Sequence, residues 1–293
     1  MNPIRQVGQD SILNTEQGKF IKQTAVEAAR RQFVGRKLVG PSGIFGPLGR
    51  GVITFNYDTR THGSDARIDY GWPGAESKDI QNFARTAVTI PNVHQEFEIN
   101  ALDLAASQLT GQPLNMSEVE SKSYKVALKE DELIIQGWSR DGGSTYEING
   151  LYNAAGNSES SDLDWGTKAN IETSIVNALG LLEADNIPGP FNLTLNPVQK
   201  SQANALIANT SKSWVSWIRE TIGGEVYSSP AVTPDTGLIT PVNPQGMFEL
   251  VLAEDLTVHL ETLPKSGNLF GKVYIRGLPV VYDSNAICKL TTI

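Results

Sequence analysis

The stretch AVEAARRQFVGRKLVGPSGIFGPLG, residues 25–49, decides the fold that the rest of the sequence must fit. Its first half consists mainly of helix-forming residues, with apolar side chains on one helical face and arginine and lysine on the other. Gly35 weakens the last turn of this helix, and Gly40-Pro41 prevents the helix from continuing. The second half is a glycine-rich turn that closes on Pro-Leu-Gly. The stretch therefore predicts an amphipathic helix followed directly by a glycine-rich loop.

The composition of the whole chain argues against several classes of protein. Its 293 residues suffice for one large domain or two small ones. The formal net charge is −8 and no basic run exceeds two residues, which argues against a nucleic-acid-binding surface. The sequence has no secretory signal and no apolar run near the roughly 20 residues of a membrane helix, so we expect a soluble, cytoplasmic protein with no membrane partner. The single cysteine, Cys288, cannot pair within the chain and is expected to be a small buried side chain.

Hydrophobic periodicity predicts a chain of mixed helices and strands. Helices are expected over 15–34, 117–137, 169–184, 197–206 and 214–220, and a short helix with a turn over 98–111. Strands are expected over 51–57, 66–70, 88–97, 191–196, 248–252, 256–260, 273–275 and 278–282. The first two strands form a long hairpin around a polar tip, and Ala253-Glu254-Asp255 is interpreted as the turn of a second hairpin. A two-stranded ribbon is marginal in water by itself, so we expect neighbouring subunits to stabilise the long hairpin.

The helix over 117–137 is the longest that the sequence predicts. Ser117 is a suitable N-cap, and Glu120 three residues later completes a capping box. Its charged residues, Glu130 and Asp131 among them, are expected on the outward face.

Five short runs, taken in order, resemble the encapsulins, a linocin-like family of proteins that assemble into hollow icosahedral shells on the tailed-phage major-capsid fold. In that family a helix ends in a Gly-Arg-Lys step, a glycine-rich loop closes on Pro-Leu-Gly, and a later Gly-Pro precedes an aromatic strand that ends in Asn. The corresponding runs here are Val34-Gly35-Arg36-Lys37, Pro47-Leu48-Gly49, Leu133-Ile134-Ile135-Gln136-Gly137, Ile148-Asn149-Gly150-Leu151 and Gly189-Pro190-Phe191 through Asn196.

The resemblance implies an α+β fold with a peripheral domain, an extended β-hairpin loop and an axial domain. The implied boundaries are 1–48 for the N-terminal arm and helix of the peripheral domain, 49–90 for the extended loop, 91–138 for the peripheral domain with its spine helix, 139–235 for the axial domain, and 236–293 for C-terminal strands that return to the peripheral domain.

The resemblance also implies the function and the partners. We expect a structural shell protein, not an enzyme, that assembles with copies of itself into an icosahedral nanocompartment in the cytoplasm. The shell would enclose cargo enzymes of the ferritin-like or peroxidase type, with iron storage as one outcome, and the cargo would dock through a C-terminal targeting peptide. Nucleic acid is not an expected partner.

Two sites follow from the resemblance. A groove for the cargo peptide is assigned to Phe20, Ile21, Val26 and Phe33, although Val26 and Phe33 are more simply explained as packing the helix onto its own subunit. A loop at the five-fold pore is assigned to Asn209, Thr210, Ser211 and Lys212.

Two alternative functions stay open at this point. One is a viral or proviral major capsid protein of the same fold, against which the acidic balance argues. The other, more distant, is a soluble hydrolase or a bacteriocin-like protein. The sequence gives that alternative no catalytic, cofactor-binding or metal site: His62, His94 and His259 are far apart, no Gly-x-Ser-x-Gly elbow occurs, and no Lys-Ser/Thr follows the glycine-rich loop.

Overall fold

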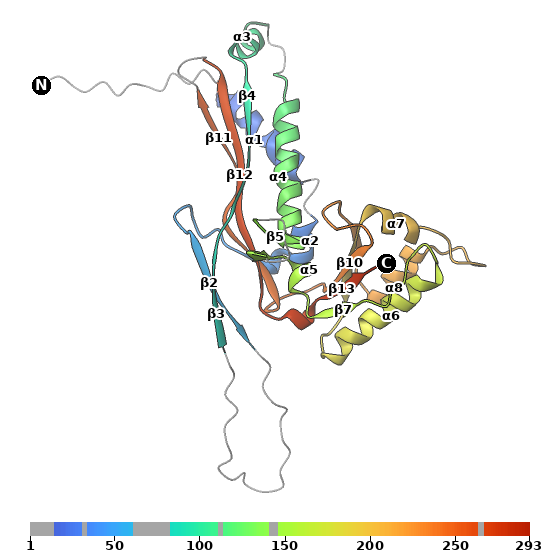
Figure 1. The fold of residues 1–293 in the computed structure, drawn as a ribbon. Helices are drawn as coiled ribbons and strands as arrows, with labels where there is room; N and C mark the ends of the chain where they lie inside the picture. The colour runs from blue at the N-terminus through green and yellow to red at the C-terminus, as the bar shows by residue number, and fades with distance from the viewer. Residues whose placement is uncertain (1–14, 31–33, 61–82, 111–113, 141–145, 263–266) are drawn as a thin grey trace, which may run out of the picture. The chain divides into compact units, whose positions relative to one another are not determined.

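A computed structural model describes residues 15–30, 34–60, 83–110, 114–140, 146–262 and 267–293 (Figure 1). The chain divides into two compact units. Unit 1 contains Met1–Phe33, Asn92–Glu130 and Glu254–Arg276, and unit 2 contains Val34–Pro91, Asp131–Ala253 and Gly277–Ile293. The divisions fall inside helix α4 (Ser117–Ile135) and inside strands β11 (Phe248–Thr262) and β12 (Leu269–Val281), so these elements contribute residues to both units.

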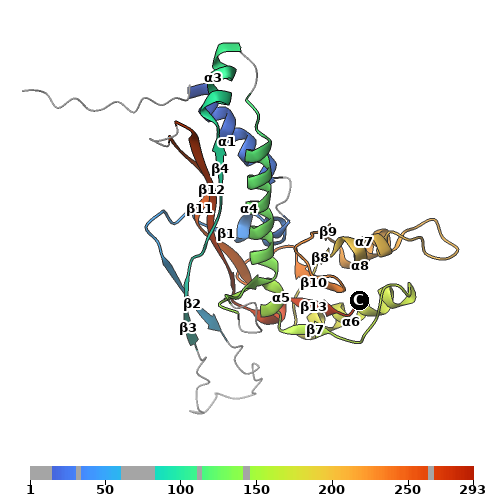
Figure 2. The ribbon, with the colours of Figure 1, turned by 45° about the horizontal axis from the view of Figure 1, so that its top comes forward.

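Unit 1 packs helices against parts of three strands, β4, β11 and β12. Strand β4 (Asn92–Ile99) runs antiparallel to β12, from Asn92 opposite Arg276 to Ile99 opposite Leu269. Helix α1 (Thr15–Arg30) and α4 lie along these strands, as Figures 1 and 2 show, and α3 (Ala101–Thr110) follows β4. The shared core consists of apolar side chains from α1, β4, α3, α4, β11 and β12, including Ile21, Ala25, Phe97, Leu104, Val119, Val126, Val258 and Val273.

The largest core of unit 2 surrounds a five-stranded sheet. Its strand order is β7 (Asn157–Glu159), β13 (Cys288–Thr291), β10 (Thr236–Pro241), β8 (Phe191–Leu195) and β9 (Val226–Ser228). Helices α6 (Ala169–Ala184) and α8 (Trp214–Ile222) contribute buried residues to this core, and α7 (Pro197–Ala203) contributes Ala203. Trp165 is fully buried in it and donates a hydrogen bond of 2.8 Å from Nε1 to Ser174 Oγ. Cys288 is buried in the same core, as predicted.

The remaining elements of unit 2 are short. Helix α2 (Gly35–Val39) and the 3-10 turn η1 (Pro41–Gly43) lead to β1 (Ile44–Phe45), which pairs in parallel with β11. Strands β2 (Thr54–Arg60) and β3 (Phe83–Thr89) form an antiparallel ribbon. Strands β5 (Gly137–Trp138) and β6 (Ile148–Asn149) form a small hairpin before α5 (Leu151–Ala154), and η2 (Ser284–Ala286) precedes β13. The full order of the four-stranded sheet is β1-β11-β12-β4.

The helix predicted over 15–34 is described over Thr15–Arg30. Helix α1 ends at Arg30, residues 31–33 lie outside the described part of the chain, and a separate helix, α2, begins at Gly35. Gly35 permits a close approach, since a Cβ atom there would lie only 2.9 Å from the Cδ1 of Ile134. Its role is therefore to bring α2 against the end of α4.

Two interruptions that the sequence predicts, one within β11 and one within β12, are absent from these strands. The expected hairpin turn at 253–255 is wrong, because β11 runs unbroken through it. That segment contains no glycine, asparagine or proline, and Ala253 is fully buried, while the carbonyls of Leu252 and Ala253 accept hydrogen bonds from the N–H groups of Leu48 and Gly49. The strands predicted over 273–275 and 278–282 are likewise one strand, β12.

The extended hairpin also differs from its prediction. The return strand expected over 66–70 lies outside the described residues. The described return is β3, whose pairing with β2 runs from Thr54 opposite Thr89 to Arg60 opposite Phe83. The single strand predicted over 88–97 is two strands, β3 and β4, because the chain breaks at Ile90-Pro91.

Helix α4 occurs where it was predicted, but its ends do not behave as expected. At its start the side chain of Asn115 accepts a hydrogen bond of 3.0 Å from the Ser117 N–H. Near its end Glu130 and Asp131 are buried, so the outward orientation assigned to them is wrong. The two carboxylate oxygens of Asp131 accept hydrogen bonds of 3.0 Å from the backbone N–H groups of Val34 and Gly35. This carboxylate thus satisfies donors at the beginning of α2, which no helical carbonyl can reach.

The end of α4 turns through a close backbone contact. Gly137 has φ +85°, and a Cβ atom at Gly150 would lie 2.2 Å from the backbone nitrogen of Gly137. Only glycine fits at both positions, because β5 and β6 approach each other too closely for a side chain.

We expect Gly150→Ala to lower the free energy of unfolding by roughly 1–3 kcal/mol, because the backbone of the small hairpin must move to admit a methyl group. Gly180→Ala is the matched control: Gly180 lies in α6 with no atom within 4 Å of the added Cβ. It should stabilise the protein by about 0.5–1 kcal/mol through helix propensity. Chemical denaturation of both variants measures the difference, and equal effects would contradict the packing argument.

Burial raises the pKa of the Asp131 carboxyl to about 6, although the two backbone N–H groups and nearby Arg36 and Lys37 oppose this rise. The folded-state pKa lies above the unfolded value of 3.8, so this group favours folding at low pH, and that contribution is lost as the pH rises from about 4 to about 6. Relative to Asp131→Asn, the wild-type protein should lose about 2–3 kcal/mol between these pH values. Denaturation of both proteins across this range tests the sign, and a constant difference would contradict it.

Candidate functional site

The candidate pore residues lie in a tight loop between α7 and α8. The N–H of Ile207 donates to the carbonyl of Lys212 at 2.9 Å, and the N–H of Trp214 donates to the carbonyl of Ala205 at 3.1 Å. At the tip Asn209 adopts φ +61°, a conformation that asparagine tolerates better than most residues. The loop is therefore a small hairpin whose shape its own backbone bonds define.

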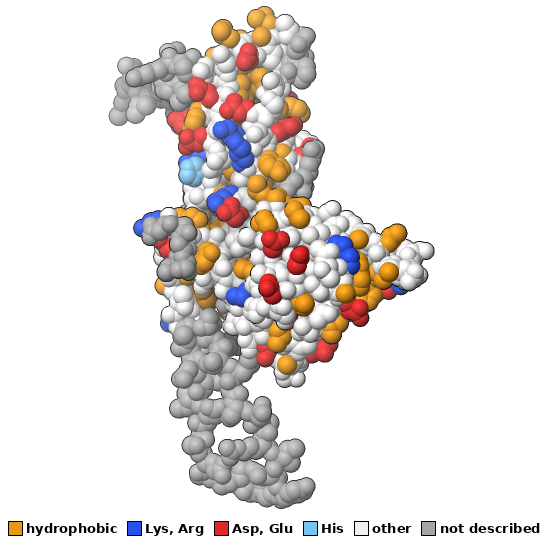
Figure 3. All heavy atoms as spheres, turned by 45° about the vertical axis from the view of Figure 1, so that its right-hand side comes forward, with side chains coloured by type: hydrophobic (Ala, Val, Ile, Leu, Met, Phe, Trp, Pro, Cys, Tyr) orange, Lys and Arg blue, Asp and Glu red, His pale blue; other side chains and the backbone are white. Residues whose placement is uncertain are grey.

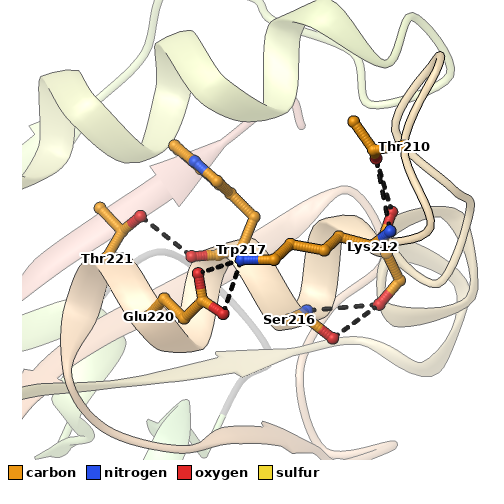
Figure 4. A network of polar contacts seen from close by, with 7 residues as sticks. Thr210, Lys212, Ser216, Trp217, Glu220 and Thr221 are labelled. Carbon is orange, nitrogen blue, oxygen red and sulfur yellow. Dashed lines mark hydrogen bonds and ion pairs between the residues drawn. The ribbon is translucent and has the colours of Figure 1, made fainter.

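Polar side chains brace this loop against α8 (Figure 4). The Thr210 hydroxyl donates to the carbonyl of Ile207 at 3.0 Å and accepts from the N–H of Lys212 at 3.3 Å. Lys212 Nζ donates to both carboxylate oxygens of Glu220, at 3.0 and 2.8 Å. With 58% and 61% of their side chains exposed, these two residues form a weak, salt-sensitive pair. The structure thus directs the one charged side chain of the candidate loop along α8, and Asn209, Thr210 and Ser211 are exposed beside it.

Helix α8 begins at the end of this loop with a side-chain cap. The Ser213 hydroxyl accepts a hydrogen bond of 3.3 Å from the N–H of Ser216, and Gly223 closes the helix in the left-handed conformation. Behind the loop, Trp214 and Trp217 meet edge to face with ring centroids 5.6 Å apart. The loop therefore stands on a capped and well-packed helix.

The residues assigned to the cargo groove differ in how far the structure buries their side chains. Ile21 is fully buried in the core of unit 1, so its side chain attaches α1 to its own subunit. Phe20 is 50% exposed, and Val26 is half-buried. Phe33 lies outside the described residues. Of the assigned set, Phe20 is the side chain most available to an incoming peptide, and the groove itself stays a prediction.

The described residues contain no candidate metal centre. No three His, Cys, Asp or Glu side chains among them could hold a metal ion together. His94 on β4 and His259 on β11 are exposed, and His62 falls outside the described part. In the part of the chain that the structure describes, no helix is both long and apolar enough to cross a membrane.

Sequence reasoning missed one cluster beside the middle of strand β2. The Tyr282 hydroxyl donates a short hydrogen bond to Glu249, and its ring meets that of Tyr57 edge-on at 6.0 Å. Burial, and then the bond to Glu249, raise the pKa of Tyr282. The cluster joins β2 to residues more than 190 positions later, and no spacing in the sequence indicates such a contact.

Solved structures define the class of protein to which this fold belongs. A virus-like particle from Pyrococcus furiosus matches with a TM-score of 0.64 at 16% identity, covering 94% of this chain and 98% of that chain. The capsid of Myoviridae phage XM1 matches with a TM-score of 0.61 at 12% identity, covering 87% and 92%. The chain therefore has the tailed-phage major-capsid fold, as predicted.

Sequence comparison then identifies the family. Residues 8–266 match the family described as encapsulating protein for peroxidase. The type 1 encapsulin shell protein EncA of Myxococcus xanthus is 29% identical over 244 residues, covering 83% of this chain and 82% of that protein. A diheme-cytochrome-encapsulin shell fusion protein of Kuenenia stuttgartiensis is 27% identical over 227 residues, covering 78% of this chain and 60% of the fusion. The chain belongs to the encapsulin family and is a shell protein.

We expect Ser213→Ala to lower the free energy of unfolding by about 1 kcal/mol, because the first turn of α8 loses its side-chain acceptor. Ser211→Ala is the matched control in the same exposed loop and should change stability by less than about 0.5 kcal/mol. Thermal unfolding of both variants measures this difference, and a larger effect at Ser211 would contradict the assignment of the cap.

Proposed function

We propose that identical copies of this chain close an icosahedral nanocompartment around cargo enzymes. The observation that carries the proposal is the family match over residues 8–266, together with a capsid-type fold that extends over nearly all of the chain. A closed shell of identical subunits needs interfaces on several sides of each subunit.

The β2–β3 ribbon supports assembly. Within the described residues it forms a sheet of two strands only, and a cross-strand ion pair between Asp58 and Arg85 lies on its surface. At its base Ile53 is 65% exposed, and Phe45 is exposed where its ring contacts Phe55. Such a ribbon is marginally stable in water, so its burial against neighbouring copies would stabilise both the ribbon and the shell.

The cargo is proposed from the family and from the relatives. The family is described by its encapsulation of a peroxidase, and one relative carries a diheme cytochrome in the same chain. We infer a cargo enzyme of the peroxidase or ferritin-like type, with iron storage in the second case, and docking through a C-terminal peptide of that enzyme. Phe20 on α1 is our candidate for the first contact, because its ring is exposed beside buried Ile21.

The shell would act as a container and not as an enzyme. The loop at Asn209–Lys212 is our candidate for the rim of a pore that admits small solutes. Neutral amide and hydroxyl groups dominate its exposed tip, because Lys212 is directed toward Glu220. We place the shell in the cytoplasm and exclude a genome from it, since the chain is acidic and lacks basic runs.

Negative-stain electron microscopy of the purified protein tests this proposal, with absorbance at 260 and 280 nm recorded on the same fraction. We expect uniform hollow particles with the absorbance ratio of protein alone. Particles that carry nucleic acid would support a viral capsid instead. A monomer or dimer at high concentration would contradict the shell.

A further inference from the structure

Helix α3 of unit 1 exposes an apolar stripe. Leu102, Ala105, Ala106 and Leu109 follow the spacing that places side chains on one face of a helix, and all four are exposed. The two leucines are 76% and 87% exposed, while Leu104 on the opposite face is fully buried in the core. Figure 3 shows hydrophobic side chains over α3 at the top of the view.

The order of side chains along this stripe is the same from either end. Leu102 and Leu109 stand at its two ends, and Ala105 and Ala106 are adjacent at its centre. The midpoint between the two alanines is therefore also the midpoint between the two leucines. If a second copy of α3 lies antiparallel across this midpoint, each Leu102 meets the partner subunit's Leu109. The small alanines at the crossing then allow the two helices to approach closely, while leucines pack at both ends.

Electrostatics also favours an antiparallel pair of α3 helices. The positive N-terminal end of each helix lies beside the negative C-terminal end of the other. The only charged side chain of α3, Asp103, follows Leu102 and points about 100° away from it around the helix axis. In the pair, the two Asp103 residues are separated by about 8 Å along the helices in addition to about 8–10 Å between the helix axes. Their repulsion is therefore largely screened at physiological salt.

The stripe is too small to hold two copies together by itself. A stable protein interface buries about 1,200–2,000 Å² in total, and four side chains, two of them alanines, supply only a small part of such an area. The stripe therefore fits a patch within a larger interface between copies. A patch that matches itself is the kind that a two-fold axis requires, because the same surface then serves both subunits.

We propose that α3 packs against α3 of a second copy across a two-fold axis that passes between Ala105 and Ala106, with the two helices antiparallel. This inference rests on the proposed shell of identical copies, since an icosahedral shell contains two-fold axes. It assigns α3 of unit 1 to one of the interfaces that such a shell needs.

Disulfide trapping in the assembled protein tests this arrangement. Ala105 lies next to the proposed axis, so Ala105→Cys brings the same position of two copies within the roughly 3.5–4.5 Å between Cβ atoms that a disulfide requires. Native Cys288 is buried, and the unmodified protein gives the background from it. We expect a covalent dimer on a non-reducing gel, at least fivefold more abundant than this background and lost on reduction.

Leu102→Cys is the matched control on the same stripe. Leu102 lies about 3.5 residues from the axis, so this position in the two copies is separated by about 10 Å along the helices, too far for a disulfide. Its dimer yield should be at least fivefold lower than that of Ala105→Cys. A protein that combines Leu102→Cys with Leu109→Cys should form the dimer again, because the two positions face each other across the axis.

Equal yields from Ala105→Cys and Leu102→Cys would overturn the proposal, because they indicate a parallel or three-fold arrangement of the helices. Intact shells without a covalent dimer of Ala105→Cys would overturn this contact alone, since another part of the chain or another partner would then cover α3. A dimer without shells would support the contact and contradict the proposed function, and the absence of both would overturn the two together. Electron microscopy of the unmodified protein and of each variant separates these outcomes.

Discussion

The buried carboxylate of Asp131 is the interaction on which the placement of the early chain depends. It lies near the end of α4 and accepts hydrogen bonds from the N–H groups of Val34 and Gly35, which are 97 and 96 residues away in sequence. Burying an ionised carboxylate costs free energy, and the raised pKa of Asp131 expresses that cost. Without it, however, two donors at the start of α2 would lose their partners. We interpret Asp131 as a residue that specifies where α2 docks, at some expense in stability near neutral pH.

Several elements follow from that docking. Leu38 and Val39 of α2 pack with Ile134 and Ile135 in a core that also contains Phe248. The chain then reaches β1, which adds to the edge of β11, and continues into the β2–β3 ribbon. The glycine at position 35 is part of the same arrangement, since any larger residue would meet Ile134. The start of α2, the core around Phe248 and the beginning of the ribbon therefore all depend on how the Val34-Gly35-Arg36-Lys37 step is placed against the end of α4.

The fold predicted from the sequence was confirmed because its strongest signals are local. The helices over Ser117–Ile135 and Ala169–Ala184 have apolar residues at helical spacing, and tertiary contacts only reinforce that periodicity. The cap of α7 by Asn196 is equally local, because its side chain binds an N–H group two residues away. The errors concern long-range contacts. Strand β11 continues through Glu254-Asp255 because other strands and the loop at Leu48 pair with it. Those partners are distant in sequence, so the residues around Glu254 do not indicate them.

The sequence by itself determined the family, the α+β class, the positions of the main helices and the burial of Cys288, since each depends on composition, periodicity or short motifs. Only the tertiary structure decided that Asp131 faces inward, that Tyr57 meets Tyr282, that Lys212 is directed to Glu220, and that α3 keeps an uncovered apolar stripe. The physical reason is the same in each case. The free energy of a side chain depends on the atoms that surround it after folding, and segments distant in sequence supply most of those atoms.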